Sequence, residues 1–396
     1  MAMLDFPVAE KDPLFALSHR FRADPRPEKL DLVLGVYRDE QGQTPVMDVV
    51  CQAELELAEQ RLSKSYRSLS GHTRFNAGMV QLLLGDALPR ARQIAALQTV
   101  GGTGALSLLA GMIAVSSPGT MVWSSDPGYV NHRPICEGAG LPIRPYRLRS
   151  KAGMADIALI LEDLEAAQSG DVVLLHGCCH NPTGLEMDLN SWSAVADLCE
   201  RKALIPFVDM AYQGFGLGLE EDAIGLRLLV ERLETVLVAA SCSKNMGLYC
   251  ERTGAALVIA SSTREASNAT AVLENLAWTN YSMPPDHGAS VASLVFQRYD
   301  LWKSELEAMR QRIVALRGQL VDCLRQTGVS RRLLDIHHHS GMFSVLPFNA
   351  KQMEFLRQEY SIYGTDGARI NVAGLSTADV PYLVRALKET SGILRT

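Results

Sequence analysis

Between residues 90 and 260, short apolar runs alternate with segments whose apolar positions recur at helical spacing. An apolar run bounded by turn residues predicts a buried strand, and the segments between such runs predict helices. Alternating strands and helices are typical of a mostly parallel sheet covered by helices on both faces. We therefore expect an α/β domain with strands at 95–100, 121–123, 172–175, 204–208, 235–240 and 255–259.

The two ends of the chain follow a different pattern. The segment 1–12 is short and mixes apolar, charged and proline residues, which predicts an arm outside the core. Pro13 lies in the first turn of a predicted short helix. A glycine-interrupted strand at 32–37, a helix at 47–62 and a polar loop at 63–76 follow. A helical stretch from 288 to about 327 leads to strands at 342–346 and 369–372 and helices at 350–360 and 379–390. We predict a small α+β domain from 13–45 and 301–396 and a large domain from 46–300.

The composition excludes several classes of protein. The chain has 396 residues, 47% of them hydrophobic, and a net charge of -6, which favours neither nucleic acid nor an anionic membrane as a partner. No apolar run approaches the roughly 20 residues that span a bilayer, and the N-terminus does not resemble a signal peptide. The cysteines form no disulfide framework, so we expect reduced core thiols in a cytoplasmic protein.

The stretch from Ser241 to Arg252 follows the apolar run at 235–240 and carries Lys244. A lone lysine is ordinarily a solvated surface charge. This lysine follows a buried strand and lies between small hydroxyl residues, so we expect lost hydration to lower its pKa and make it a nucleophile toward aldehydes. Ser241, Ser243 and Arg252 suit a phosphate group. An aldehyde-binding lysine among phosphate ligands suggests pyridoxal phosphate.

Asp209 ends the apolar run at 204–208. Such an aspartate is often a helix cap. A buried carboxylate otherwise needs a cation or several donors, and a protonated pyridine nitrogen would be a functional partner. We favour that role because Lys244 is predicted at a neighbouring strand end.

Two turns at strand ends carry further candidates. Gly101 to Gly104 is a weak signal alone, but its amides, a helix N-terminus and the Thr103 hydroxyl suit an anion. Asn181, in the turn 181–184, and Tyr212 could both donate to a phenolate oxygen. For His176 and His180, a packing or hydrogen-bonding role is as plausible as a cofactor contact.

Two late motifs have ordinary alternatives. His337 to His339 invites a metal interpretation, but consecutive residues on a strand point to opposite faces, so we assign no metal. Arg369 begins a late apolar strand. It could be a surface arginine or a bidentate holder of an α-carboxylate.

Taken together, these motifs resemble the aspartate/aromatic aminotransferase family, class I of the pyridoxal-phosphate enzymes of fold type I. The resemblance covers nearly the whole chain, from 12–13 to 371–374. It rests on the motifs at 35–37, 101–106, 176–184, 211–215, 243–245, 247–249, 251–252 and 280–282. It implies a large domain with a mostly parallel, seven-stranded type of sheet and a smaller α+β domain.

The resemblance also implies roles for single residues. Lys244 would be the Schiff-base lysine and proton carrier, Asp209 would pair with the pyridine nitrogen, and Asn181 and Tyr212 would hold the phenolate oxygen. The phosphate would be held by Gly102, Thr103, Ser241, Ser243 and Arg252. Tyr66 would reach the phosphate of a neighbouring subunit, which implies a homodimer with shared sites. Arg369 would bind the substrate α-carboxylate, helped by the Gly35 backbone.

The chain departs from the family pattern around the substrate. Tyr129 stands where a ring-stacking tryptophan is usual, and it can still stack. Trp278 stands where a partner-donated arginine usually binds the distal carboxylate, and Met283 replaces an asparagine. Because tryptophan cannot neutralise a carboxylate, we expect aspartate to be a poor substrate and an aromatic or other apolar amino acid to be preferred. With 2-oxoglutarate as acceptor, another cation would be needed; Arg67 and Arg133 are candidates.

Other functions remain open at this point. A lyase, racemase or decarboxylase of the same fold would use the same lysine and aspartate, and a dicarboxylate aminotransferase could use a different distal cation. An aminotransferase-like domain of a transcription regulator is disfavoured, because no basic helix-turn-helix precedes residue 30. The sequence does not name the donor, the acceptor or the pathway.

Overall fold

The computed structural model describes residues 13–85, 93–151 and 153–393, so the arm predicted at 1–12 lies outside the described residues. The chain divides into two compact units. The larger comprises Thr44–Val314 and His338–Met342, and the smaller comprises Met1–Gln43, Ala315–His337 and Phe343–Thr396. The domain limits expected from the sequence stay a prediction. Within the described part of the chain, no helix combines the length and apolar character that a membrane crossing requires.

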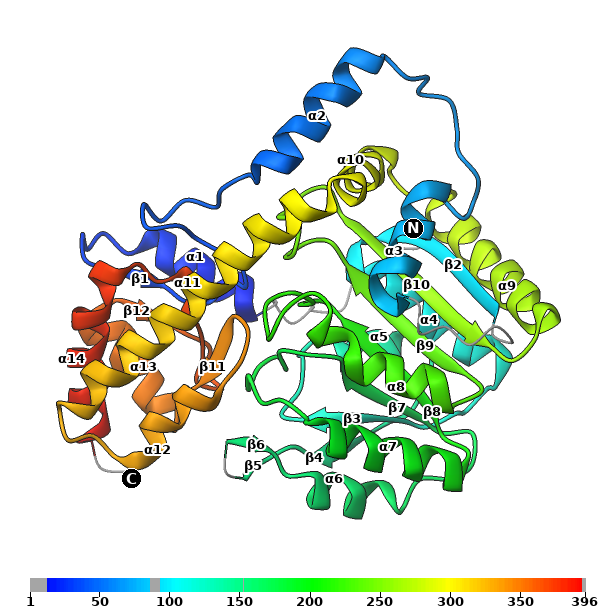
Figure 1. The fold of residues 1–396 in the computed structure, drawn as a ribbon. Helices are drawn as coiled ribbons and strands as arrows, with labels where there is room; N and C mark the ends of the chain where they lie inside the picture. The colour runs from blue at the N-terminus through cyan, green and yellow to red at the C-terminus, as the bar shows by residue number, and fades with distance from the viewer. Residues whose placement is uncertain (1–12, 86–92, 152, 394–396) are drawn as a thin grey trace, which may run out of the picture. The chain divides into compact units, whose positions relative to one another are not determined.

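A seven-stranded sheet organises the larger unit (Figure 1). Its strands lie in the order β2 (Gln93–Val100), β10 (Thr253–Ala260), β9 (Val236–Ser241), β8 (Ile205–Met210), β7 (Val172–His176), β3 (Val122–Asp126) and β4 (Ile143–Arg147). Strand β10 is antiparallel to both of its neighbours, and the remaining pairs are parallel. The predicted mostly parallel sheet is confirmed. The edge strand β4 was missed, because most of its residues are exposed and they include arginines and a proline.

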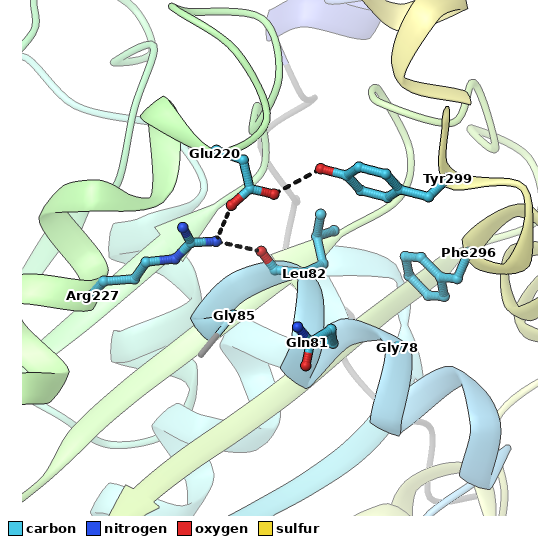
Figure 2. Close-up of a pocket in the computed structure, with 8 residues that line it drawn as sticks. All are labelled: Gly78, Gln81, Leu82, Gly85, Glu220, Arg227, Phe296 and Tyr299. Carbon is cyan, nitrogen blue, oxygen red and sulfur yellow. Dashed lines mark hydrogen bonds and ion pairs between the residues drawn. The ribbon is translucent and has the colours of Figure 1, made fainter. Parts of the chain in front are cut away.

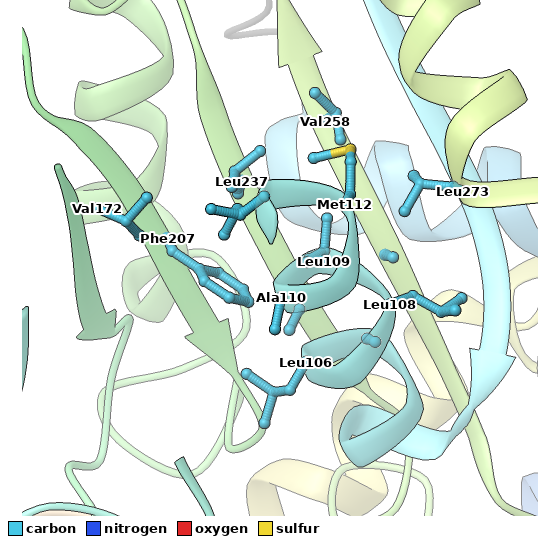
Figure 3. Close-up of a cluster of buried hydrophobic side chains, with 14 of the residues drawn as sticks. Leu106, Leu108, Leu109, Ala110, Met112, Val172, Phe207, Leu237, Val258 and Leu273 are labelled. Atoms are coloured by element: carbon cyan, nitrogen blue, oxygen red, sulfur yellow. The ribbon is translucent and has the colours of Figure 1, made fainter. Parts of the chain in front are cut away.

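Helix α4 (Gly101–Ser116) packs against one face of this sheet, behind it in the view of Figure 1. Figure 3 shows its apolar side chains next to strand residues of the sheet. Leu106, Leu109 and Met112 belong to one buried cluster with Phe207 and Leu237. Burying a leucine of this kind contributes roughly 1.5–3 kcal/mol. The cluster therefore fixes the N-terminus of α4 against the strands that carry the candidate site. It also includes Leu273 and Ala277 of α9 (Thr263–Tyr281).

The other helices of the larger unit are α2 (Asp48–Gln60), α3 (Thr73–Leu84), α5 (His132–Gly138), α6 (Ile157–Leu164), α7 (Leu189–Lys202), α8 (Ile224–Arg232) and α10 (Asp286–Gln297). Helices α7 and α8 lie in front of the sheet in Figure 1. A hairpin of β5 (Ser150–Lys151) and β6 (Met154–Ala155) and the short helix η1 (Glu221–Ala223) complete the unit.

The helix boundaries differ from the expectation in two places. The predicted loop at 63–76 ends early, because His72 caps α3 by accepting a hydrogen bond from the Phe75 amide. The predicted stretch from 288 to 327 is two helices, α10 and α11 (Tyr299–Arg325). Arg298 interrupts it with φ -111° and ψ 42°. The division between the units falls within α11.

The smaller unit contains two short sheets and several helices. Strand β1 (Leu30–Asp31) pairs with β12 (Ile362–Tyr363), and β11 (Phe343–Val345) pairs with β13 (Arg369–Asn371). Its helices are α1 (Pro13–Ala23), α12 (Arg331–Leu334), α13 (Ala350–Tyr360) and α14 (Val380–Ser391), with the short turns η2 (Asp335–His338), η3 (Val372–Gly374) and η4 (Thr377–Asp379).

Three local predictions were wrong. No strand covers 32–37, and the nearest one, β1, is Leu30–Asp31. The side-chain amide of Asn371, not a neighbouring strand, donates to the carbonyls of Leu34 and Val36. The residues 337–339 are not on a strand, since η2 covers 335–338. Cys51 and Cys250 are exposed, so they are not core thiols, whereas the adjacent pair at 178–179 is buried.

Candidate active site

The candidate residues at the carboxyl ends of β7, β8 and β9 line one cavity of about 140 Å³ with the start of α4. Ligands in open α/β sheets collect at this edge. The lining is Gly102, Thr103, Leu106, Tyr129, His176, Asn181, Asp209, Ala211, Tyr212, Ser241, Ser243, Lys244 and Arg252. The structure thus brings together the candidates that the sequence placed at separate strand ends.

One end of this cavity suits an anion. Gly101, with φ 66°, opens α4, and a Cβ there would lie 2.6 Å from Nη2 of Arg252. Only glycine lets the backbone come this close to the guanidinium. Arg252 itself has a positive φ of 52°, a conformation that is often retained at functional sites. Its Nη1 donates to Ser243 Oγ at 3.4 Å, and the Ser243 amide donates to Ser241 Oγ at 3.1 Å.

Lys244 lies beside Tyr212 in the middle of the cavity. Its Nζ is 4.9 Å from the centroid of the tyrosine ring. The phenol oxygen of Tyr212 accepts a hydrogen bond from Nδ2 of Asn181 at 3.4 Å. An amine, a phenol and an amide therefore converge from three different loops.

Asp209 is a buried carboxylate on β8, and His132 of α5 is its partner. Nε2 of His132 lies 2.9 Å from Oδ2 of Asp209. Because a carboxylate only accepts, this nitrogen carries the proton. Burial would raise the pKa of Asp209, but the hydrogen bond and charge of His132 outweigh it and hold the pKa below its usual value. Asp209 is therefore ionised and can form an ion pair with a cation in the cavity.

Two further histidine rings lie next to His132: His176 packs against it, and His180 packs against His176. His180 bonds to Ser125 and Thr183, each at 2.9 Å, which makes it a hydrogen-bonding histidine. His176 lines the cavity, and burial lowers its pKa to about 3. Among the described residues, neither of its ring nitrogens has a hydrogen-bond partner. A buried polar group without a partner needs an explanation, and a ligand in the cavity that His176 lines would supply one.

These observations match a flat, charged cofactor with a phosphate. The helix N-terminus, two hydroxyls and a guanidinium suit the phosphate, the ionised Asp209 suits a ring cation, and His176 offers unmatched nitrogens. His132, His176 and Asp209 are also close enough to ligate a metal. We favour the cofactor, because a proton already occupies the His132 nitrogen that faces Asp209.

Four predicted residues do not line this cavity. Tyr66 is 90% exposed and Trp278, on α9, is 64% exposed. Gly35 and Arg369 belong to the smaller unit. There, Nη2 of Arg369 donates to the Val33 carbonyl at 2.6 Å, and its guanidinium lies over the ring of Phe343. A Cβ on Gly35 would lie 2.6 Å from the same ring.

Sequence reasoning missed His132. It begins α5 and does not directly follow a strand in the sequence, and only the fold brings it to Asp209. The candidate cations Arg67 and Arg133 are both paired, with Asp286 and Glu137 respectively.

A larger hollow of about 660 Å³ lies elsewhere in the same unit (Figure 2). The charged side chains that line it already have partners. Glu220 forms an ion pair with Arg227 at 2.7 Å and accepts a hydrogen bond from Tyr299 at 2.7 Å. Arg227 also donates to the Leu82 carbonyl at the end of α3. None of the candidate residues lines this hollow, so its size does not make it the active site.

Known proteins resemble this chain over nearly its full length. The model of the family "Aminotransferase class I and II" matches residues 27–387. The aromatic-amino-acid aminotransferase of Paracoccus denitrificans is 43% identical over 96% of this chain and 97% of its own length. The aspartate aminotransferase of Escherichia coli is 39% identical over 96% of this chain and 98% of its own length.

A solved structure agrees with these relatives. The aromatic-amino-acid aminotransferase from Burkholderia pseudomallei, covalently bound to pyridoxal phosphate, superimposes with a TM-score of 0.94. It is 36% identical, over 97% of this chain and 98% of that chain. Pyridoxal phosphate carries the ring nitrogen and the phosphate that suit the lining of the cavity around Lys244. This chain therefore belongs to the class I and II aminotransferases and is a pyridoxal-phosphate-dependent transaminase.

Proposed function

We propose that this transaminase takes its amino group from an aromatic or other apolar L-amino acid and passes it to a 2-oxo acid, 2-oxoglutarate in the first instance. The observation that carries the proposal is Trp278, a residue that is 64% exposed near the end of α9. An indole offers apolar area and stacking, worth about 0.5–1.5 kcal/mol beyond burial, and no charge for a distal carboxylate. The 43% identical relative is named for aromatic amino acids.

The cavity residues would divide the chemistry among themselves. The cofactor, when bound, supplies the electron sink for the electron pair left on the substrate Cα when its proton is removed. Nζ of Lys244 would hold the cofactor aldehyde and then carry the proton that leaves the substrate Cα. Asp209, kept ionised by His132, would stabilise the positive ring nitrogen. Asn181 and Tyr212 would donate to the phenolate oxygen.

The remaining candidates would position the two ligands. Gly102, Thr103, Ser241, Ser243 and Arg252 would bind the phosphate through the α4 N-terminus, the hydroxyls and the guanidinium. The ring of Tyr129, which lines the same cavity, would stack on the cofactor. Arg369 would bind the α-carboxylate near Gly35.

We also propose that the enzyme is a homodimer with shared sites. Tyr66 and Trp278 are large side chains that are 90% and 64% exposed, and exposed aromatic side chains of this kind are typical of interfaces. In the dimer, Tyr66 would reach the partner's phosphate and Trp278 would border the partner's substrate. The buried thiols support a reducing compartment, the cytoplasm.

The substrate preference can be tested in a single half-reaction. The cofactor-loaded enzyme is mixed with aspartate, glutamate, phenylalanine, tryptophan or alanine, without acceptor, and the absorbance of the aldehyde form of the cofactor is followed. Conversion to the amine form by aromatic donors, with little or none by aspartate, is the expected result. Rapid conversion by aspartate would instead indicate a dicarboxylate aminotransferase with another distal cation.

The same experiment addresses the other reactions of this fold. A transaminase leaves the amine form of the cofactor behind. A lyase, a racemase or a decarboxylase returns the aldehyde form, so release of ammonia or carbon dioxide, or loss of chirality, without the amine form would overturn the proposal.

A further inference from the structure

Arg67 and Asp286 form a two-pronged ion pair on the larger unit. Nε of Arg67 donates to Oδ1 of Asp286 at 2.8 Å and Nη2 donates to Oδ2 at 3.2 Å. The two side chains are 36% and 31% exposed, so both can be reached from outside. The ion pair occupies the edge of the guanidinium formed by Nε and Nη2. Among the described residues, Nη1 of Arg67 has no hydrogen-bond partner.

Arg67 is adjacent to Tyr66 in the sequence and contacts the segment that follows Trp278. Its amide contacts Sδ of Met283 in that segment at 3.2 Å. Gln98 of β2 ties the two segments together, because it accepts from the His72 amide at 2.9 Å and donates to the Pro285 carbonyl at 2.7 Å. We call the residues Tyr66, Arg67, Trp278 and Met283 the aromatic rim.

Asp286 can tolerate sharing its arginine with a second anion. It is the first residue of α10, where the helix N-terminus stabilises a negative charge. Its Oδ2 also accepts a hydrogen bond from Ser290 Oγ at 3.0 Å. A second carboxylate can therefore bind Arg67 without leaving Asp286 uncompensated. The negative charge of Asp286 nevertheless reduces the pull of Arg67 on that second carboxylate.

We propose that Arg67 is the cation that binds the distal carboxylate of the dicarboxylic acceptor, and that Asp286 keeps this binding weak. The inference rests on the proposed function, in which the aromatic rim borders the substrate. It explains how a site with Trp278 admits both kinds of ligand: the indole packs against an aromatic side chain, and the open edge of Arg67 binds a carboxylate. The other candidate, Arg133, pairs with Glu137 on the exposed face of α5.

The test compares two acceptors on the amine form of the enzyme. The wild type, Arg67→Met and Asp286→Asn are each mixed with 2-oxoglutarate or with phenylpyruvate, which lacks a distal carboxylate. Arg67→Met should lower kcat/KM for 2-oxoglutarate by at least about tenfold and change that for phenylpyruvate by less than about threefold. Asp286→Asn should raise kcat/KM for 2-oxoglutarate by roughly three- to tenfold. Arg74→Met, an exposed arginine on α3, is the matched control.

A binding measurement separates affinity from turnover. Calorimetric titration with glutarate, an unreactive dicarboxylate, should show binding weakened about tenfold or more in Arg67→Met and partly restored in Arg67→Lys, which keeps the charge but loses the fork. Equal losses with both acceptors would show that Arg67 only supports the loop, and an unchanged response to 2-oxoglutarate would place the cation elsewhere. Either result overturns the inference. Failure of the proposed function is distinct, because it is read from the donor half-reaction of the wild type, which would then convert rapidly with aspartate or form no amine with any donor.

Discussion

The imidazole of His132 donates a hydrogen bond to the carboxylate of Asp209 over 2.9 Å, joining the start of α5 to the end of β8. Both side chains are buried, and Nδ1 of His132 has no partner among the described residues. The contact fixes the orientation of the carboxylate and keeps it ionised against the effect of burial. His132, which is not among the residues that line the cavity around Lys244, thereby controls the charge of Asp209.

Replacing His132 should therefore affect the cofactor ring through Asp209. In His132→Ala, the buried carboxylate loses its donor and its pKa rises toward the value that burial favours. We expect kcat/KM to fall on the order of tenfold to a hundredfold, since leaving a buried polar group unpaired costs about 1–3 kcal/mol. The acid limb of the pH–rate profile should move to higher pH.

His132→Gln provides the control, because a glutamine amide can still donate to Asp209. It should recover part of the lost activity and return the acid limb toward that of the wild type. If the alanine variant keeps the wild-type pH profile, the histidine only packs against its neighbours.

Lys244 is predicted to be the residue on which turnover depends. Lys244→Ala should retain the fold, since Lys244 lines the cavity and is not part of the apolar cluster around α4. Without its amine, the rate of conversion of the aldehyde form by phenylalanine should fall by about 10³-fold or more. Stopped-flow absorbance measures the rate, and circular dichroism checks the fold. A variant that keeps more than a tenth of the rate would show that another base moves the proton.

Substituting Trp278 should redirect the substrate preference. Trp278→Arg supplies a fork for a distal carboxylate and removes the apolar indole. We expect kcat/KM for aspartate to rise by roughly tenfold or more and that for phenylalanine to fall by several-fold. Trp278→Phe, which adds no charge, should leave aspartate as poor a donor as in the wild type. No gain for aspartate in the arginine variant would remove Trp278 from the substrate site.

Glu186 gives the fold a pH dependence that is independent of catalysis. It lies in the loop that also carries Asn181, and its Oε1 accepts from the Cys179 amide at 2.7 Å. Burial, with a smaller effect of Asp222, raises the pKa of Glu186 from 4.5 to about 8. The folded state therefore holds a proton that the unfolded state releases between these two values.

The sign of the effect on stability follows from this difference. Where the folded state binds more protons, the free energy of unfolding falls as the pH rises, so Glu186 stabilises most below pH 4.5 and loses this contribution up to about pH 8. Glu186→Gln stays neutral and keeps an acceptor oxygen. Its melting temperature should rise relative to the wild type as the pH increases through this window. Glu162→Gln, at an exposed position, should show no such trend, and equal trends in both variants would contradict the assignment.

Much of the secondary structure of the larger unit was predictable, because each strand is encoded by a run of neighbouring apolar residues. The apolar runs gave every strand of the sheet except β4, whose arginines and proline interrupt the pattern. The polar residues that end these strands were predictable as one site, because parallel strands bring their carboxyl ends to a common edge. The break between α10 and α11 at Arg298 was not, since no proline or glycine marks it.

The sequence by itself determined the kind of chemistry: a lysine, an aspartate and a set of candidate phosphate ligands at neighbouring strand ends, with Trp278 in place of a cation. Only the tertiary structure decided which distant side chains meet. It joined His132 to Asp209, Arg67 to Asp286, and the Asn371 side chain to the carbonyls of residues 34 and 36. The physical reason is that periodicity and turn chemistry report a residue's immediate neighbours, whereas these contacts depend on how buried elements pack and on which partner can satisfy each polar group removed from water.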